Sequence, residues 1–505
     1  MSGVMKKIQI IVFLIAALLS LAAAQSLPAL TPPGAVGGFY TRNLSVKKAF
    51  FVDFQAEWNR LGINDLIFNM IEDDPDFSEG DIDDLKKFFT IDIIGREAIL
   101  VFYANGDFFF LTRPAAKNAA EIISAVRDQL DSPKQRGGWL VEENEEDGIA
   151  LIVGVSSDAI LIASPEAANR FFSGDRGLKI PVSGDIAAWF KPQPLWGYLD
   201  NPDLNLPPSA IAAIKTFTGL ASASNFQIDG VYENSSFCLD PNQDSDLAKI
   251  FLTSDSAWDL ATLPHGLSAT SGVIDLPALG RYVNRWAAEF NFDIDIDLSS
   301  FGTRFALIDA GSENPQQALQ NPMGSLLLLL ETQDSLTAEV TLLSWLQMAA
   351  AFATPEGEGG FSVEPIAVNG RDGKAIQLGL TGTIYLVSYD DHLALATSKD
   401  ALDLLTAPKL GSDPDFSRLS KMLPANYWGA SYGNYNKTLK QAAQIFPLMM
   451  MQSIGDAETQ QITTELTMKL SQFFVFMADR TGGAISYTKQ KNKCLVSSGF
   501  IEVNW

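Results

Sequence analysis

A repeated strand pattern limits what this chain can fold into more than any other feature. Residues 383–405 read TIYLVSYDDHLALATSKDALDLL, and residues 149–171 read IALIVGVSSDAILIASPEAANRF. The two stretches align without a gap at a shift of 234 residues (398 − 164), which sets Ser398 on Ser164. Each gives an apolar strand, a short polar turn, a second apolar strand and a serine that can cap a helix. The pattern predicts a β-hairpin that leads into a helix, present twice because the chain is a tandem duplication.

A second pair of motifs extends the repeat toward the start of each copy. A short strand followed by an aspartate that can cap a helix occurs at 49–53 and again at 272–275. A strand marked by glycine follows an acidic segment at 94–100 and at 301–307, with a shift of 207 residues (302 − 95). Because strands joined by short polar turns outnumber strand–helix–strand patterns, we expect an α+β fold. The expected architecture is a tandem duplication of antiparallel sheets with helices packed on one face.

The repeat also sets the expected boundaries along the 505 residues. A stretch rich in Pro, Gly and Ala precedes the first strand and is typical of a flexible linker. Each repeat continues from a larger unit, which holds the shared hairpin, into a smaller unit with a closing hairpin. The predicted parts are a signal peptide at 1–24, a linker at 25–38, a first repeat at 39–258 (larger unit 39–180, smaller unit 181–258) and a second repeat at 259–505 (larger unit 259–412, smaller unit 413–505).

The first 24 residues have the features of a secretory signal. Lys6 and Lys7 precede an apolar run at 8–21, and three alanines at 22–24 supply a cleavage site. The run is short for a membrane span, so we expect cleavage, with retention as an anchor as the alternative. No later stretch is long and apolar enough to span a bilayer, so the mature chain is expected to have no transmembrane segment.

Charge and cysteine content narrow the partners and the source of stability. The chain has 36 basic and 60 acidic residues and a net charge of −24. This argues against nucleic acid or an anionic membrane surface as the partner, because both bind clustered Lys and Arg. Two cysteines, Cys238 and Cys494, lie near the ends of their repeats. They can pair if the repeats meet about a pseudo-twofold axis, and otherwise they are separate buried thiols.

Several motifs together carry a resemblance to a known family. They are the signal peptide, the strand–Asp–helix starts at 52–53 and 274–275, the Asp-rich segment 295–298 before Phe301-Gly302, the hairpin end 395–398, and the entry 415–424 to the last unit. With these, residues 40–505 resemble the exported bacterial proteins catalogued as domain of unknown function three-three-five-two. The resemblance implies a bacterial protein that is periplasmic or extracellular, and it supplies no activity or catalytic residues. The first repeat departs from the pattern in its acidic segment and at Ile180-Pro181.

One motif has the form of a hydrolase nucleophile. Residues 429–433 read GASYG and match G-x-S-x-G, with a predicted strand before them and a helix after them. That mechanism takes its base from a histidine later in the chain, whereas His265 and His392 both precede Ser431. We therefore interpret the motif as an ordinary strand with glycines where backbones approach closely, and we expect no catalytic residues here.

Acidic residues gather in two places that are candidates for an ion. Residues 73–81 resemble a calcium loop but lack the Gly and Glu that its sixth and twelfth positions require. Asp293, Asp295 and Asp297 alternate with apolar residues, which predicts one solvated face of a strand. Neighbours on such a face lie ~6.8 Å apart, too far for one ion to bind all three. No His or Cys pair has the spacing of zinc ligands, so we expect no metal and no cofactor.

Two further patterns have simple structural interpretations. Residues 370–374 (GRDGK) lack the spacing of a phosphate loop and predict a hairpin turn. The methionines at 449–451, Met468 and Met477 crowd the last unit. Soft side chains of this kind can line an adaptable apolar pocket, but they are more typical of a core.

These observations favour a protein that binds over one that catalyses. We expect an exported, non-catalytic envelope protein, a scaffold or binding protein whose partner is a protein or an apolar ligand. The alternative is a carrier that holds an apolar or lipid-like ligand between a curved sheet and the helices rich in Met and Phe. An enzyme that uses carboxylates alone, such as a glycosidase, is a third hypothesis, and it needs two acidic side chains facing each other across a cleft.

Overall fold

The computed structural model describes most of the chain beyond residue 25. The described residues are 26–42, 53–63, 65–66, 96–115, 119–146, 149–201, 204, 206–292, 295–311, 324–353, 361–378, 382–452 and 457–503. The predicted signal peptide, the strand expected at 49–52, the acidic loop at 73–81 and Asp293 lie outside them.

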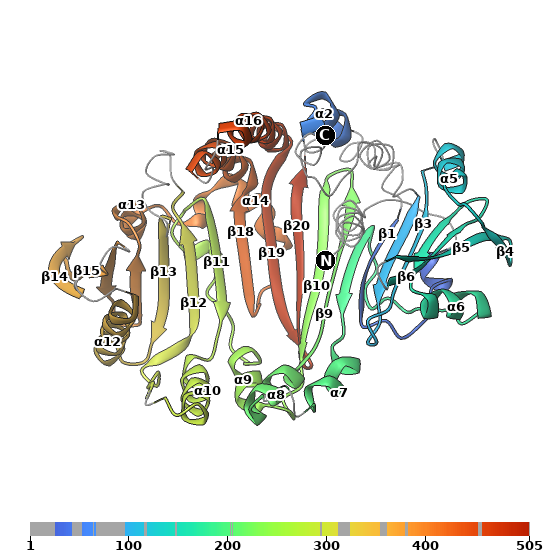
Figure 1. Cartoon of the computed structure of the whole chain (residues 1–505). Coiled ribbons are helices and arrows are strands. Elements are labelled where there is room, and N and C mark those ends of the chain that lie inside the picture. The colour runs from blue at the N-terminus through green and yellow to red at the C-terminus, as the bar shows by residue number, and fades with distance from the viewer. Residues whose placement is uncertain are drawn as a thin grey trace.

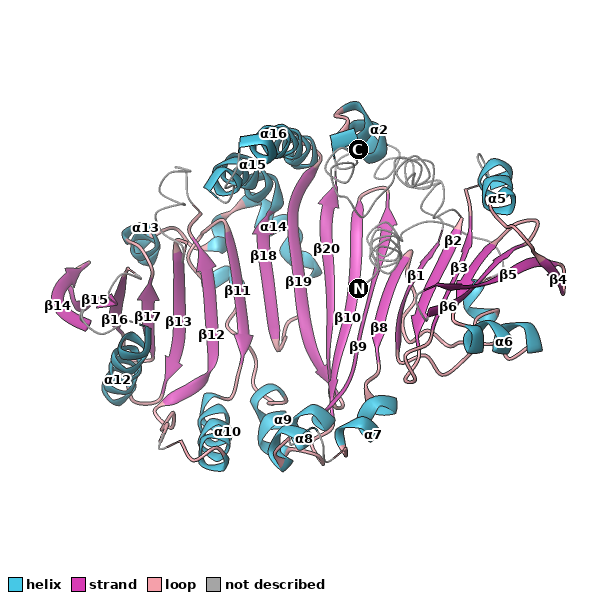
Figure 2. Cartoon of the chain, in the orientation of Figure 1, coloured by secondary structure: helices cyan, strands magenta, loops and turns pink. Residues whose placement is uncertain are grey.

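Twenty strands of the described residues form one antiparallel sheet that runs across the whole molecule (Figure 1, Figure 2). From one edge to the middle they are β4 (Lys134–Arg136), β5 (Trp139–Glu146), β6 (Ile149–Val155), β7 (Ile160–Ala163), β3 (Phe108–Arg113), β2 (Glu97–Phe102), β1 (Gly37–Arg42), β8 (Ile186–Phe190), β9 (Phe217–Gln227) and β10 (Gly230–Leu239). From the other edge they are β14 (Phe361–Val368), β15 (Arg371–Leu378), β16 (Thr383–Ser388), β17 (His392–Ala396), β13 (Leu326–Thr332), β12 (Phe301–Asp309), β11 (Ser268–Val273), β18 (Gly429–Asn434), β19 (Thr481–Lys491) and β20 (Cys494–Val503).

The same order of strands occurs twice, because adding ten to each strand number of the first series gives the second. The hairpins that align in the sequence are β6–β7 and β16–β17, and Ser164 and Ser398 each precede a helix directly after the second strand. The two series meet where β10 pairs with β20, and Cys238 lies opposite Cys494 at one end of that pairing. These cysteines form a disulfide, so of the two alternatives the paired one is correct.

Helices lie at the strand ends and over the faces of the sheet, which makes the fold a mixture of α and β structure as expected. The α-helices of the described residues are α2 (Asp53–Arg60), α5 (Ala119–Asp128), α6 (Pro165–Ser173), α7 (Trp196–Leu199), α8 (Pro208–Thr216), α9 (Ser245–Phe251), α10 (Leu276–Glu289), α12 (Ser335–Ala353), α13 (Lys399–Asp403), α14 (Pro414–Leu419), α15 (Tyr435–Gln452) and α16 (Ala457–Ala478). In Figure 1 the helices α15 and α16 lie along the upper rim of the sheet and α8, α9 and α10 along the lower rim.

Both faces of the sheet are covered near its two edges, so the expectation of helices on one face was wrong. Successive residues of a strand point to opposite faces. In β7, Ile160 packs with Ile123 of α5, whereas Leu161 belongs to the core that contains Phe171 of α6. In the other half, α12 and α13 pack on opposite faces of β16 in the same way. The physical reason is that these hairpin strands are apolar on both sides, as strands buried on two faces are.

The two faces differ in the middle of the sheet. We call the back face the one that carries Tyr40, Trp189 and Ala221, all buried in a core that α6 covers. In the second half the back face packs against α13 and α14. We call the opposite face, which carries Phe39 and Leu220, the hollow face, and it points toward the viewer in Figure 1.

The segment before β1 was expected to be a flexible linker, and this expectation was wrong. Leu27 and Thr31 are fully buried, and the short 3-10 helix η1 (Leu27–Ala29) packs on the back-face core. The Leu27 N–H donates to a carboxylate oxygen of Glu97 at 2.7 Å. The second half has the same element, η6 (Leu260–Thr262), with Leu260 fully buried. Composition rich in Pro and Ala therefore marks a packed segment here, and the ordered part of the first half includes residues 26–38.

Candidate functional site

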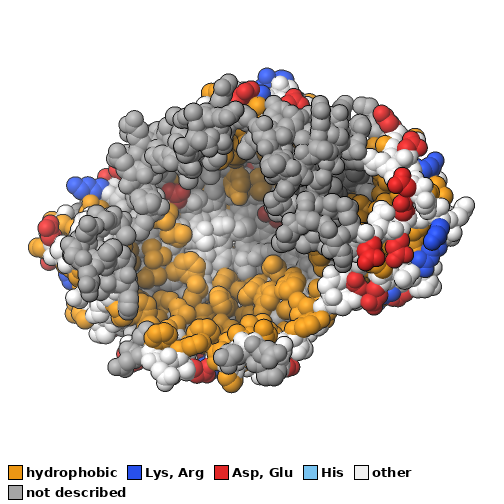
Figure 3. All heavy atoms as spheres, in the orientation of Figure 1, with side chains coloured by type: hydrophobic (Ala, Val, Ile, Leu, Met, Phe, Trp, Pro, Cys, Tyr) orange, Lys and Arg blue, Asp and Glu red, His pale blue; other side chains and the backbone are white. Residues whose placement is uncertain are grey.

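The hollow face presents half-exposed apolar side chains on the strands in the middle of the molecule. They are Phe39 (40% exposed), Phe102 (39%), Phe190 (38%), Leu220 (48%) and Leu307 (38%). Phe190 lies opposite Leu220 across β8 and β9, and Leu220 lies opposite Phe237 across β9 and β10. Figure 3 shows hydrophobic side chains gathered in the hollow over the lower ends of these strands and the adjoining helices. A contiguous exposed apolar area is typical of a binding surface.

The sequence of β9 explains why apolar side chains point out of the core here. From 220 to 224 it reads LASAS, and the residues alternate between the two faces. Ala221 and Ala223 are buried on the back face, and Leu220 and Ser222 are exposed on the hollow face. The strand thus places its small apolar residues in the core and its large one on the open side, which packing alone would not favour.

Beside the apolar side chains, the floor of the hollow face consists of small hydroxyl residues and glycine. They are Ser222, Ser224, Ser235, Thr270, Gly429, Ser431, Ser486, Thr488, Ser497 and Gly499. The hydroxyls of Thr488 and Ser497 lie 2.7 Å apart across β19 and β20. Among the residues of β8, β9, β10, β18, β19 and β20 that alternate onto this face, Glu233 alone is charged. The floor is therefore polar but almost uncharged, in a chain whose net charge is −24.

Ser431 occupies an ordinary strand position on this floor, as the sequence predicts. It lies inside β18, which pairs with β11 on one side and β19 on the other, and its hydroxyl is 2.7 Å from that of Ser486. The histidines have other partners. His265 Nε2 lies 3.1 Å from an Asp413 carboxylate oxygen, and His392 Nδ1 lies 2.6 Å from one of Asp391.

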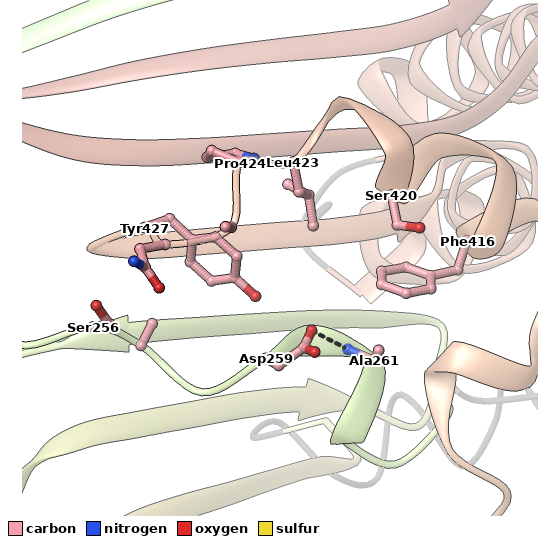
Figure 4. Close-up of a pocket in the computed structure, with 11 residues that line it drawn as sticks. Ser256, Asp259, Ala261, Phe416, Ser420, Leu423, Pro424 and Tyr427 are labelled. Carbon is pink, nitrogen blue, oxygen red and sulfur yellow. Dashed lines mark hydrogen bonds between the residues drawn. The ribbon is translucent and has the colours of Figure 1, made fainter.

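One cavity of about 310 Å³ lies between η6 and the segment that leads into β18 (Figure 4). Two of its polar side chains, those of Tyr427 and Asp259, hold the backbone. The Tyr427 hydroxyl accepts from the Leu260 N–H at 3.0 Å and donates to the Trp258 carbonyl at 3.3 Å, and burial raises the pKa of Tyr427. Asp259 caps η6 through the Ala261 N–H at 3.0 Å. These bonds give the cavity a structural role.

A second cavity of about 240 Å³, which we call the aromatic pocket, lies on the back face of the second half. Its lining residues are Trp258, Thr262, Leu263, Pro264, Leu329, Tyr389, Asp391, His392, Leu405 and Lys409. The rings of Tyr389 and His392 stack with their centroids 4.4 Å apart and an angle of 6° between their planes. Trp258 approaches His392 edge-on at 6.2 Å. Sequence reasoning treated His392 as an exposed turn residue and missed Trp258 and Tyr389, because they come from segments 131 residues apart (389 − 258).

In the first half, a buried carboxylate binds groups from several parts of the chain. Glu97 is 1% exposed and accepts from the Tyr40 hydroxyl at 2.6 Å, from the Leu27 N–H and from Arg113 Nη1 at 3.1 Å. Burial raises the pKa of the Glu97 carboxyl, although these hydrogen bonds act in the opposite direction. Arg113 also pairs with Asp158, which lies at the surface, at 3.2 Å. The buried ion pair of Glu97 and Arg113 thus holds three further groups, the Leu27 N–H, the Tyr40 hydroxyl and the Asp158 carboxylate.

The second half has an ion pair at the same ladder position with the charges exchanged. Glu97 lies opposite Arg113 across β2 and β3, and Arg304 bonds to Glu331 across β12 and β13 with Nε to Oε1 at 2.7 Å. Burial alone would raise the pKa of Glu331, but hydrogen bonds from Arg304 and the Thr303 N–H outweigh it and hold that pKa below its usual value. Exchange of the two charges preserves attraction while changing both residue types, which hides the correspondence from sequence alignment.

The acidic motif that the structure describes does not form the predicted strand face. Residues 295–298 are not in a strand, because each aspartate there bonds locally. Asp295 accepts from the Asn284 side chain at 3.1 Å, and Asp297 accepts from the Ser299 N–H at 2.8 Å. No group of three His, Cys, Asp or Glu side chains suited to a metal occurs among the described residues. A hairpin turn is present near the predicted 370–374, but it consists of Asn369 and Gly370, and residues 371–374 already pair as part of β15.

Comparison with known proteins does not place the chain in a family. No family model matches it, and no curated protein matches it. Among solved structures, crystal form IV of TP0453 matches with 14% identity over 43% of this chain and 81% of that chain, at a TM-score of 0.23. Crystal form I of TP0453 matches with 14% identity over 45% of this chain and 87% of that one, at a TM-score of 0.24. These TM-scores lie below the level that defines a shared fold. Separately, no helix in the described part of the chain combines the length and apolar character needed to cross a bilayer.

Proposed function

We propose that this is an exported, non-catalytic protein of the bacterial envelope whose hollow face binds a neutral apolar or lipid-like ligand. The export proposal rests on the signal sequence at 1–24. We also propose that the chain arose by tandem duplication, which is supported by the repeated strand order and by the shared setting of Ser164 and Ser398.

The observation that carries the binding proposal is the row of half-exposed Phe and Leu side chains beside an almost uncharged floor of hydroxyl residues. Covering Phe190 and Leu220 with a hydrocarbon chain removes apolar surface from water. The serine and threonine hydroxyls next to them can donate to or accept from the polar end of the same ligand. Glu233 is the one charged group on this face of the central strands, so an anionic ligand finds no counter-charge there and a cationic ligand finds a single carboxylate. An uncharged amphiphile therefore complements this face best.

The test replaces Leu220 with Asp and measures what the protein carries. Leu220 is about half exposed, so the fold tolerates the change, but a carboxylate would lie against the ligand chain. Losing about 1 kcal/mol of apolar contact and adding a charge predicts at least a tenfold weaker complex. Ile228→Asp is the matched control, because Ile228 is 90% exposed in the turn between β9 and β10.

The measurement is native mass spectrometry of protein purified from a bacterial envelope without detergent. The expected result is an adduct of lipid-like mass on the wild type and the control, and little or none on Leu220→Asp. A wild type that carries no such adduct and does not raise the fluorescence of N-phenylnaphthylamine would refute the proposal. A co-purified protein lost on Leu220→Asp would instead favour the scaffold hypothesis.

A further inference from the structure

We propose that the aromatic pocket of the second half binds a neutral, hydroxyl-rich ring of the size of one sugar unit. This site lies on the back face and does not depend on the hollow face.

The pocket exists in the second half because a large ring of the first half has a smaller counterpart there. Seven residues after Ser164 stands Phe171, which is 2% exposed and packs in the middle of the back-face core. Seven residues after Ser398 stands Leu405, which lines the pocket. A leucine fills less space than a phenylalanine, so the same place in the fold is packed in one half and hollowed in the other.

A second aromatic side chain of the first half, that of Trp139, also has no aromatic counterpart in the second half. Trp139 packs edge-on against Phe171 with the ring centroids 5.6 Å apart. The strand β5 starts with the pair Arg136↔Trp139 and the strand β15 starts with the pair Val368↔Arg371, so Trp139 corresponds to Arg371. The Arg371 guanidinium lies over the Tyr389 ring, 4.6 Å from its centroid, so a flexible cationic side chain replaces the rigid indole.

The residues that line the space are suited to a ring with apolar faces and polar edges. The bottom of the aromatic pocket is apolar, because it is formed by the buried side chains of Leu263 and Leu329. The ring of Trp258 gives a flat surface that packs on the C–H face of a saturated ring. The Tyr389 ring is already covered, because His392 stacks on it and the Arg371 guanidinium lies over it at 4.6 Å, so it forms a fixed wall of the pocket. Sugar rings have such C–H faces, whereas their hydroxyls point outward at the edge.

The polar groups at the rim match hydroxyls better than they match an ion. Asp391 accepts, Lys409 donates and the Thr262 hydroxyl does both. The Nδ1 atom of His392 lies 2.6 Å from an Asp391 carboxylate oxygen and so orients that carboxylate at the rim. The lining residues contribute one carboxylate and one ammonium and therefore no net charge, while the nearby Arg371 guanidinium is engaged over the Tyr389 ring. A ligand that both donates and accepts without being charged is complementary to these lining groups.

The size of the pocket limits the ligand to one ring. Pockets for drug-sized ligands measure roughly 300–1,000 Å³, and this one is about 240 Å³. It is also open to solvent along Lys409 and Asp391, both of which are exposed. A single ring can therefore be the end of a longer glycan that continues outside the pocket.

The experiment uses the full mature chain and two probes, methyl β-glucopyranoside and N-acetylglucosamine, in saturation-transfer NMR. The wild type is expected to transfer saturation to the ring protons of at least one probe. Leu405→Phe, which restores the residue of the first half, is expected to weaken the binding at least tenfold. Leu336→Phe is the matched control, because Leu336 is exposed on α12 outside the pocket.

A second variant protects the test against misfolding. Lys409→Ala changes an exposed side chain and is expected to weaken probe binding severalfold while leaving the melting temperature unchanged. The proposal is overturned if neither probe receives saturation from the wild type at millimolar concentration, or if both Leu405→Phe and Lys409→Ala leave the signal unchanged. Stronger transfer to benzoate than to either sugar would overturn the assignment of the ligand as a hydroxyl-rich ring.

Discussion

Replacing Glu97 should destabilise the first half of the molecule and detach the segment 26–36 from its core. This carboxylate joins three parts of the chain, because Leu27, Tyr40 and Arg113 all bond to it. Glu97→Ala leaves the Arg113 guanidinium, itself 9% exposed, with Asp158 as its remaining ion-pair partner among those described above. It also leaves the buried hydroxyl of Tyr40 and the N–H of Leu27 without this acceptor.

The size of the effect follows from these contacts. Breaking a buried ion pair by removing one partner costs roughly 3–5 kcal/mol, because the remaining charge stays buried. Glu97→Gln keeps the shape and one acceptor oxygen but loses the charge, so we expect a loss of about 2 kcal/mol. Glu166→Gln is the control, since Glu166 is exposed on α6 in the same half.

The assay combines denaturant unfolding with hydrogen exchange of residues 26–36. We expect the unfolding midpoint to be lowest for Glu97→Ala, intermediate for Glu97→Gln and highest for the wild type. We also expect the amides of Leu27 and Thr31 to exchange faster in both variants than in the wild type. If Glu97→Ala unfolded within 0.5 kcal/mol of the control, or if residues 26–36 exchanged at the wild-type rate, the anchoring role would be refuted.

Two further predictions concern the join between the halves and the exchanged ion pair. Cys238→Ser combined with Cys494→Ser removes the disulfide that joins residues 256 apart. Loop-closure entropy predicts a stability loss of about 5.5 kcal/mol, and native disulfides typically contribute about 2–5 kcal/mol. An unchanged denaturation midpoint would contradict this. The pKa of Glu331 is held below its usual value, so the stability linked to it is present above the unfolded pKa near ~4.3 and is lost as pH falls through the folded one. Glu331→Gln should therefore flatten the fall in melting temperature between pH 5 and pH 3, and a slope equal to that of the wild type would refute this.

The elements that sequence reasoning found are those that local pattern determines. The β6–β7 and β16–β17 hairpins, the turn at Gly370 and the strand around Ser431 follow from alternation and turn residues. The apolar run of β6, IALIVGV, also contained the signal for cover on both faces, since a strand with one wet face alternates.

What sequence reasoning missed depends on contacts between distant residues. The segment at 26–36 looks like a linker by composition, and it is ordered because Glu97, 70 residues later, binds the Leu27 amide. The aspartates at 295 and 297 alternate as in a strand, but their side chains accept hydrogen bonds from the Asn284 side chain and the Ser299 N–H in an irregular segment. The aromatic pocket arises from a Phe-to-Leu difference that looks conservative in alignment.

Site-specific photocrosslinking at Leu220 tests the central claim, that the hollow face holds a neutral apolar ligand, most directly. A benzophenone side chain placed there, and a second one at Ile228 as the control, would be irradiated in the envelope of the producing bacterium. The account predicts that position 220 captures lipid-like molecules identified by mass and that position 228 does not. Capture of water alone at 220, or equal capture at both positions, would contradict it.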